Sequence, residues 1–188
     1  MFSLKSKKIK ILIPLLIVLS TLTVVYLAWS PESKAVSPED RELNEEWTLT
    51  VDGLVDRRLN LTLKDILEMP STVVKAELWC VGDPEGINAY TANWTGVPLN
   101  HILDKAGASD EAIKVAFYAV DGFTTDLTLE EARRADVILA YKKDGKFLPD
   151  DGMIYPPLRL VVPGRWGYKW IKWVNRIELV NYDFKGYY

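Results

Sequence analysis

A single cysteine, Cys80, is the residue of this chain best suited to chemistry. It ends the segment 73–80, which is rich in apolar and β-branched residues, and Gly, Asp and Pro follow it in 81–86. This pattern predicts a buried strand that ends in a loop, where proteins often present functional side chains. A lone cysteine forms no intrachain disulfide, so Cys80 is an inert core residue, a reactive thiol or a soft metal ligand. The residues around it leave all three open.

A second candidate is the segment 152–177, which carries cations but no carboxylate. Its five basic residues are Arg159, Arg165, Lys169, Lys172 and Arg176. Gly164 and Gly167 bracket a turn that could direct backbone N–H groups at an anion, and the cations would supply the charge that a phosphate needs. Trp166, Trp170 and Trp173 are flat rings of the kind that line pockets for planar ligands. The alternative interpretation is a solvated basic face.

The only histidine, His101, is the one base available for a cysteine hydrolase. It lies in a predicted helix that begins at Pro98 and is closed by Gly107. His101 falls between the apolar positions of that helix, which favours a partly exposed structural residue over a catalytic partner for Cys80.

The elements that must position these residues indicate a mixed α and β domain. Strands are expected at 47–51, 59–61, 73–80, 113–120, 123–127, 137–141, 146–148, 158–162 and 176–180, and helices at 63–69, 99–106 and 129–134. A capping box formed by Thr128 and Glu131 begins the last helix, and Lys143-Asp144-Gly145 is a hairpin signal. With about eight strands and only short helices between them, α+β fits better than a doubly wound sheet.

The N-terminal part predicts a membrane anchor. Residues 11–29 form a nearly unbroken apolar run of the length that spans a bilayer, after a basic tail at 1–10 and before a polar linker at 30–44. Lysines precede the run and carboxylates follow it, so the positive-inside rule places the N-terminus in the cytoplasm and the domain, 45–188, outside. The expected location is therefore the cell membrane, with a single pass. A cleaved signal peptide is the competing interpretation.

The charge of the domain argues against nucleic acid as a partner. Of the 23 Lys and Arg residues, four lie in the tail, which leaves 19 against 26 Asp and Glu in the linker and the domain together, a balance of −7. An acidic domain is a poor binder of a phosphate backbone.

The motifs that follow Cys80 resemble the molybdopterin-binding domain of the sulfite oxidase family. They are residues 94–99 (WTGVPL), 144–149 (DGKFLP), 158–164 (LRLVVPG) and 167–173 (GYKWIKW). The resemblance runs in order from about residue 47 to residue 182, and it implies the β-rich fold of that family with short helices.

The resemblance also implies a cofactor and its ligands. Cys80 occupies the place of the thiolate ligand of molybdenum. Arg159, Lys169 and Lys172 occupy positions that hold the pterin cofactor and its phosphate, and Trp170 and Ile171 contribute in the same loop. The implied cofactor is Mo-molybdopterin, and the implied reaction is a two-electron oxygen-atom transfer on a small-molecule substrate, with a haem or quinone protein as electron partner.

Four departures from the family pattern shape the remaining expectations. Phe123 stands where sulfite-oxidising members have a tyrosine, and Asp83 and Glu85 stand where arginines would bind an anion, so we expect a substrate other than sulfite. The N-terminal portion of the family is largely missing, and Lys7-Lys8 replaces a twin-arginine signal. The first hypothesis is a membrane-anchored molybdopterin-dependent oxidoreductase, and the alternative is a cofactor-free extracytoplasmic binding or assembly module.

Overall fold

The computed structural model describes residues 47–83, 85–87, 89–148 and 158–187, which all lie in one compact unit, Pro38–Tyr188. The expected tail (1–10), membrane segment (11–29) and linker (30–44) fall outside the described residues. Within the described ranges, no helix has the length and apolar character needed to cross a bilayer.

The first sheet has the strand order β2-β1-β10-β5-β6. Its strands are β1 (Thr48–Gly53), β2 (Leu59–Thr62), β5 (Lys114–Ala119), β6 (Thr124–Thr128) and β10 (Val174–Val180). β1 and β10 run parallel, with Val51 opposite Ile177, and the other neighbours are antiparallel. Both of these side chains are fully buried, so this face of the sheet forms part of the core.

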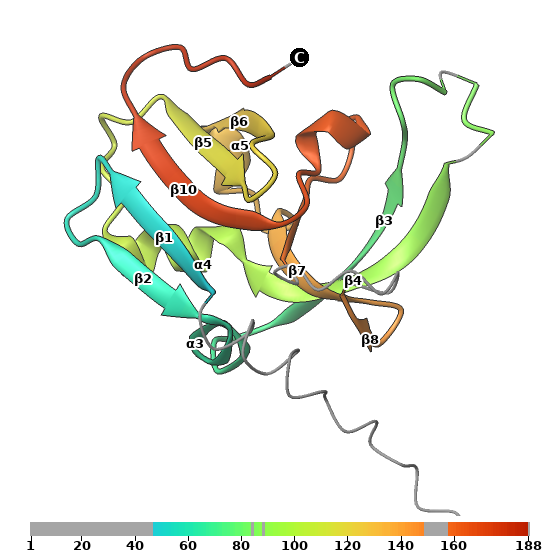
Figure 1. The fold of residues 1–188 in the computed structure, drawn as a ribbon, viewed down its shortest axis with the longest axis horizontal. Coiled ribbons are helices and arrows are strands. Elements are labelled where there is room, and N and C mark those ends of the chain that lie inside the picture. Colours follow the sequence, from blue (N-terminus) through green and yellow to red (C-terminus); the bar gives the residue numbers. More distant parts are fainter. Residues whose placement is uncertain (1–46, 84, 88, 149–157, 188) are drawn as a thin grey trace, which may run out of the picture. The chain divides into compact units, whose positions relative to one another are not determined.

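The second sheet contains the hairpin that carries Cys80. Its strands are β3 (Thr72–Leu78), β4 (Tyr90–Pro98), β7 (Ile138–Lys143), β8 (Lys146–Phe147) and β9 (Arg159–Val161). β4 lies between β3 and β7, and β9 pairs with β7. Figure 1 shows β3 and β4 as a long hairpin, and the loop with Cys80 joins them beyond the pair formed by Leu78 and Tyr90.

The helices are short. They are α3 (Leu63–Leu67), α4 (Leu99–Ala106), α5 (Leu129–Ala132) and the single 3-10 turn η1 (Gly167–Lys169). Capping boxes begin α3, from Thr62 and Asp65, and α5, from Thr128 and Glu131. Gly107 ends α4 with a φ of 68°, which only glycine adopts without strain. α3 and α5 each end two residues earlier than the sequence predicts.

The α+β class and the β-rich arrangement with short helices are confirmed, but the expected number of strands is too low. The described residues form ten strands, and the one absent from the sequence-based expectation is β4. The hairpin at Asp144 and Gly145 is confirmed, because both residues have positive φ values, 49° and 80°, as a type I′ turn requires.

Two tryptophans join the second sheet to the segment that precedes β10. Trp94 in β4 and Trp170 after η1 are 0% and 1% exposed, and their rings meet edge to face with centroids 5.8 Å apart. Such pairs add about 0.5–1.5 kcal/mol to the free energy of burial. This contact helps to fix the cation-rich segment, which we call the basic segment and which the structure describes from residue 158 to residue 177, on β4. β4 is the neighbour of β3, and Cys80 follows β3.

Candidate functional site

A pocket of about 220 Å³ brings the basic segment together with the β5–β6 turn. The residues that line it are Asp121, Phe123, Arg159, Gly167, Trp170, Ile171 and Lys172. We call it the Arg159 pocket. Four of the five residues expected to bind a cofactor through the basic segment therefore border one cavity, although nothing in that expectation required them to be neighbours.

Arg159 and Lys172 are held side by side by the backbone. The two residues form an isolated antiparallel bridge, and Leu160 N donates a hydrogen bond to Ile171 O at 2.9 Å. The guanidinium of Arg159 lies 5.4 Å from the centroid of the Trp94 ring. Two cations in one pocket repel each other, and an anion bound between them removes that cost.

The chain turns sharply directly after Lys172. Trp173 has a φ of 58°, a left-handed conformation that costs an L-residue about 1–2 kcal/mol. Its carbonyl accepts a hydrogen bond from Val120 N at 3.1 Å, which ties the turn to the end of β5. Strained residues concentrate at functional sites, where the surrounding structure holds them.

Cys80 lies beside this pocket rather than inside it. Its thiol is exposed, and its neighbour Trp79 accepts a hydrogen bond through its carbonyl oxygen from Gly167 N at 2.6 Å. Gly167 itself lines the Arg159 pocket. The end of β3 and the basic segment, more than 80 residues apart in the chain, are thus in direct contact, and Cys80 is not enclosed in hydrocarbon.

Only glycine fits at position 167. A Cβ atom there would lie 2.9 Å from Trp79 O and 3.5 Å from Leu78 Cδ2. The first distance is shorter than real Cβ contacts, and the atom it meets is backbone, which cannot move without displacing the end of β3. Gly167 therefore permits the close approach of the two segments.

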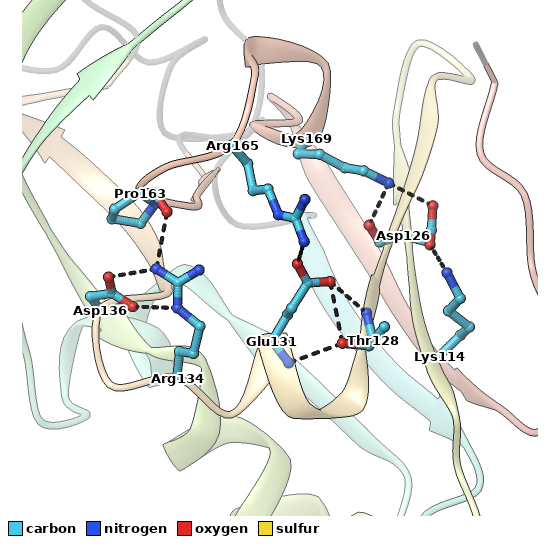
Figure 2. Close-up of polar contacts among 9 residues, drawn as sticks. All are labelled: Lys114, Asp126, Thr128, Glu131, Arg134, Asp136, Pro163, Arg165 and Lys169. Atoms are coloured by element: carbon cyan, nitrogen blue, oxygen red, sulfur yellow. Dashed lines mark hydrogen bonds and ion pairs between the residues drawn. The ribbon is translucent and has the colours of Figure 1, made fainter.

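Lys169 does not line the Arg159 pocket, unlike the other basic residues expected to bind the cofactor. Its ammonium donates to Asp126 Oδ1 at 2.8 Å and to Asp126 O at 2.9 Å, as Figure 2 shows. Asp126 is 4% exposed, and its second carboxylate oxygen accepts from Lys114 at 2.5 Å. The hydrogen bond to Asp126 raises the pKa of Lys114. In this arrangement Lys169 anchors η1 to β6.

Folding supplies the carboxylates that the basic segment lacks. Arg165 pairs with Glu131 in α5, and Arg176 pairs with Asp52 at 3.0 Å in β1. Together with the ion pair of Lys169 and Asp126, three of the five cations form ion pairs with acidic side chains from other elements. Figure 2 shows two of these pairs, those of Arg165 and Lys169. The sequence interval could not show these partners from elsewhere in the chain. Of the five cations, Arg159 and Lys172 are the two that line the Arg159 pocket.

Trp170 and Ile171 border the pocket with very little exposed surface, 1% and 2%. The indole nitrogen of Trp170 donates to Arg165 O at 3.0 Å, so its polar atom is occupied within the protein. A ligand in the pocket would meet mainly the backbone of these two residues. Their side chains serve the core.

The β5–β6 turn contributes two residues to the pocket. Phe123, identified from the sequence as a departure from the family pattern, lines it, and so does Asp121, which sequence reasoning did not select. Asp121 Oδ1 accepts a hydrogen bond from Phe123 N at 3.0 Å. The Asp-Gly turn signal located this bend in the sequence, but it did not indicate what the bend faces.

His101 and Cys80 lie at opposite ends of β4. The strand begins at Tyr90, which pairs with Leu78 near Cys80, and it ends at Pro98, directly before α4 and His101. Its eight steps span about 26 Å. This separation argues against a cysteine hydrolase. Among the described residues, no group of three or more His, Cys, Asp or Glu side chains forms a metal site.

Comparisons with known proteins agree with this geometry. The sequence model of a family described as the oxidoreductase molybdopterin binding domain matches residues 34–188. The uncharacterized oxidoreductase YuiH of Bacillus subtilis is 33% identical over 144 residues, which cover 76% of this chain and 70% of that protein. The NADH nitrate reductase of Ulva prolifera is 30% identical over 176 residues.

A solved structure shares the fold. The sulfane dehydrogenase SoxCD from Paracoccus pantotrophus superposes with a TM-score of 0.67 at 26% identity, and the match covers 74% of this chain and 39% of that one. The match to the nitrate reductase covers 76% of this chain but only 20% of the relative. This chain thus spans about a fifth of the nitrate reductase and most of YuiH.

Proposed function

Because this chain belongs to the family of oxidoreductase molybdopterin-binding domains, we propose that it is an oxidoreductase that ligates molybdenum through Cys80 and holds the pterin in the Arg159 pocket. The cofactor of the family, Mo-molybdopterin, has a soft-metal end and an anionic phosphate end. These two ends require different chemistry from the protein, and the two candidate segments offer one each.

The residues present fit both ends. Cys80 supplies a thiolate, a ligand type suited to soft metal centres, from an exposed position at the end of β3. Arg159 and Lys172 supply charge-assisted hydrogen-bond donors for the phosphate. Trp170 and Ile171 line the same pocket as the two cations. Lys169 acts indirectly in this proposal, because its contact with Asp126 holds η1 in place.

When bound, the cofactor supplies a two-electron oxygen-atom transfer at molybdenum. The side chains of this protein orient that centre and shape the space for the substrate. Phe123 has no hydroxyl, so it cannot donate a proton or a hydrogen bond to the substrate, and it presents an apolar surface to the pocket instead. A substrate other than sulfite remains our proposal on this basis.

The observation that carries the proposal is the hydrogen bond from Gly167 N to Trp79 O. It joins the strand that ends at Cys80 to the segment that carries Arg159 and Lys172. A ligand long enough to reach from a metal to a terminal phosphate can therefore use both segments at once.

We also propose that residues 11–29 anchor the chain in the cell membrane, with the N-terminus in the cytoplasm and the domain outside. The apolar run and the lysines before it support this placement. Electrons would then pass to a haem or quinone protein of the same membrane.

Metal and pterin measurements test the function. We expect protein from a host that makes the cofactor to contain close to one molybdenum per chain by mass spectrometry, and Cys80→Ser to lose most of it. The pterin, measured as its fluorescent product after acid oxidation, should accompany the metal in the wild type. Protein with no pterin and less than a tenth of an equivalent of molybdenum would favour the cofactor-free module instead.

A further inference from the structure

A second pocket, of about 390 Å³, lies against the end of β3. Its lining residues are Glu77, Trp79, Gly164, Arg165 and Trp166. We call it the tryptophan pocket. Trp79 directly precedes Cys80, so one wall of this pocket is one residue, or about 3.8 Å between Cα atoms, from the proposed metal ligand.

Two indole rings form a corner of the tryptophan pocket. Trp79 and Trp166 stand at 88° to each other with centroids 6.2 Å apart. Trp166 is 41% exposed, an unusual state for so large an apolar side chain. Perpendicular aromatic faces at an open cavity are suited to a compact apolar or cationic group, which can contact both rings.

Two charged side chains line this pocket, the carboxylate of Glu77 and the guanidinium of Arg165. Glu77 is exposed and, among the described residues, takes part in no ion pair. The guanidinium of Arg165 is paired with Glu131, so its charge is largely balanced. Lys75 lies two residues before Glu77 on the same face of β3 but does not line the pocket. Glu77 is therefore the carboxylate available to a cation in this pocket, while Glu131 already balances the charge of Arg165.

We propose that the tryptophan pocket binds a methylated ammonium group carried by the substrate. The two indole faces attract such a cation through their ring quadrupoles, and Glu77 neutralises it. The inference rests on the proposed function in one respect, because only a bound cofactor makes the occupant a substrate. The pocket itself needs no cofactor to bind the cation.

Binding of choline to the full-length protein, measured by isothermal titration calorimetry, tests this inference. 3,3-Dimethyl-1-butanol has the same shape without the charge and serves as the reference ligand. Because the indole rings attract a cation but not the neutral alcohol, we expect choline to bind about tenfold more tightly than this alcohol, which corresponds to about 1.4 kcal/mol. Sulfite and nitrate should not compete with choline.

Variants assign the binding to the pocket. Trp166→Ala should weaken choline binding about tenfold or more, whereas Trp166→Phe keeps an aromatic face and should stay within about threefold. Glu77→Gln should remove most of the preference for choline over the alcohol. Glu111→Gln, at an exposed glutamate outside the pocket, should change nothing. Circular dichroism and the melting temperature of each variant confirm that it is folded.

The outcomes separate this inference from the proposed function. Equal affinity for choline and the alcohol, or choline binding unchanged in Trp166→Ala, would overturn the ammonium site even in a preparation with a full equivalent of molybdenum. Selective choline binding in protein that lacks molybdenum and pterin would uphold the site and remove the proposed function.

Discussion

Arg159 and Lys172 are the two cations of their segment that line the Arg159 pocket, whereas Arg165 and Lys169 lie on carboxylates. This difference could not be predicted from the sequence, because Glu131 and Asp126 belong to a capping box and a strand far from the segment. The family resemblance placed Arg159, Lys169 and Lys172 together as cofactor ligands. The structure places Arg159 and Lys172 on the Arg159 pocket and Lys169 on Asp126.

We expect Arg159→Ala and Lys172→Ala each to reduce the pterin content about tenfold or more at limiting cofactor, because a charge-assisted hydrogen bond contributes about 1.5–3 kcal/mol. The measurement is the fluorescence of oxidised pterin per mole of protein. Lys146→Ala, at an exposed lysine of β8, is the matched control and should keep the wild-type content. Wild-type pterin in both pocket variants would contradict the assignment of the phosphate to this pocket.

At the scale of elements, the contact between the end of β3 and η1 depends on one glycine. We predict that Gly167→Ala lowers the free energy of unfolding by about 1–3 kcal/mol, the range for inserting a methyl group into a closed contact. It should also reduce the molybdenum content, because Cys80 moves away from the Arg159 pocket. Thermal denaturation and metal analysis measure both effects.

Gly82→Ala is the control for this substitution. A Cβ at Gly82 would lie 3.8 Å from Cys80 Sγ, an ordinary van der Waals contact, so the variant adds the same methyl group in the same region without a clash. If Gly167→Ala matched Gly82→Ala in both melting temperature and molybdenum content, the close approach at Trp79 would have no functional importance.

Helix α5 is attached to the basic segment through Glu131, and this attachment depends on pH. Burial raises the pKa of Glu131, but hydrogen bonds from Thr128 and Arg165 outweigh burial and hold it below the ordinary value of 4.5. A lowered pKa in the folded state stabilises the protein above pH 4.5, and the stabilisation is lost as the pH falls through the folded-state pKa.

We therefore expect the difference in melting temperature between the wild type and Glu131→Gln to be constant at neutral pH and to shrink below pH 4.5. Glu130→Gln, an exposed neighbour in the same helix, should differ little from the wild type at any pH. A difference for Glu131→Gln that grows on acidification would show that the sign of this linkage is wrong.

Local signals predicted most of the elements. The capping box at Thr128, the Asp144-Gly145 turn and the apolar strands of the first sheet all depend on neighbours in the chain. β4 was not among the expected strands, although Ala92, Trp94 and Val97 show the buried positions of a strand. Its pairing with β3 and β7 on both sides outweighs the weak local preference.

At the scale of the whole molecule, the site draws on segments that lie far apart in the chain. Cys80 and the 158–172 segment could be linked in advance only through the family resemblance, since no local rule predicts that Gly167 reaches Trp79. The tryptophan pocket could be predicted neither from local sequence signals nor from the family resemblance. It depends on the angle between the indoles of Trp79 and Trp166 and on the pairing of Arg165, both of which are products of tertiary structure.

The proposed anchor makes a prediction for the complete chain. Full-length protein should stay with membranes after alkaline carbonate extraction, because an apolar helix of about 20 residues spans the bilayer. A variant without residues 1–44 should appear in the soluble fraction. Replacing Lys5, Lys7, Lys8 and Lys10 with Gln should leave the protein in the membrane after carbonate extraction. It should lower the fraction of chains whose N-terminus lies in the cytoplasm, since the lysine bias sets the orientation.

Protease added to intact spheroplasts measures that orientation. We expect it to digest the 45–188 domain of the wild-type chain while a tag at residue 1 stays protected, and we expect protection of the tag to fall in the four-lysine variant. A cleaved signal peptide would give a different result: the tag would be lost during export, and the mature domain would leave the membrane under carbonate without any deletion. A domain that is resistant in intact spheroplasts and digested only after lysis would reverse the proposed topology.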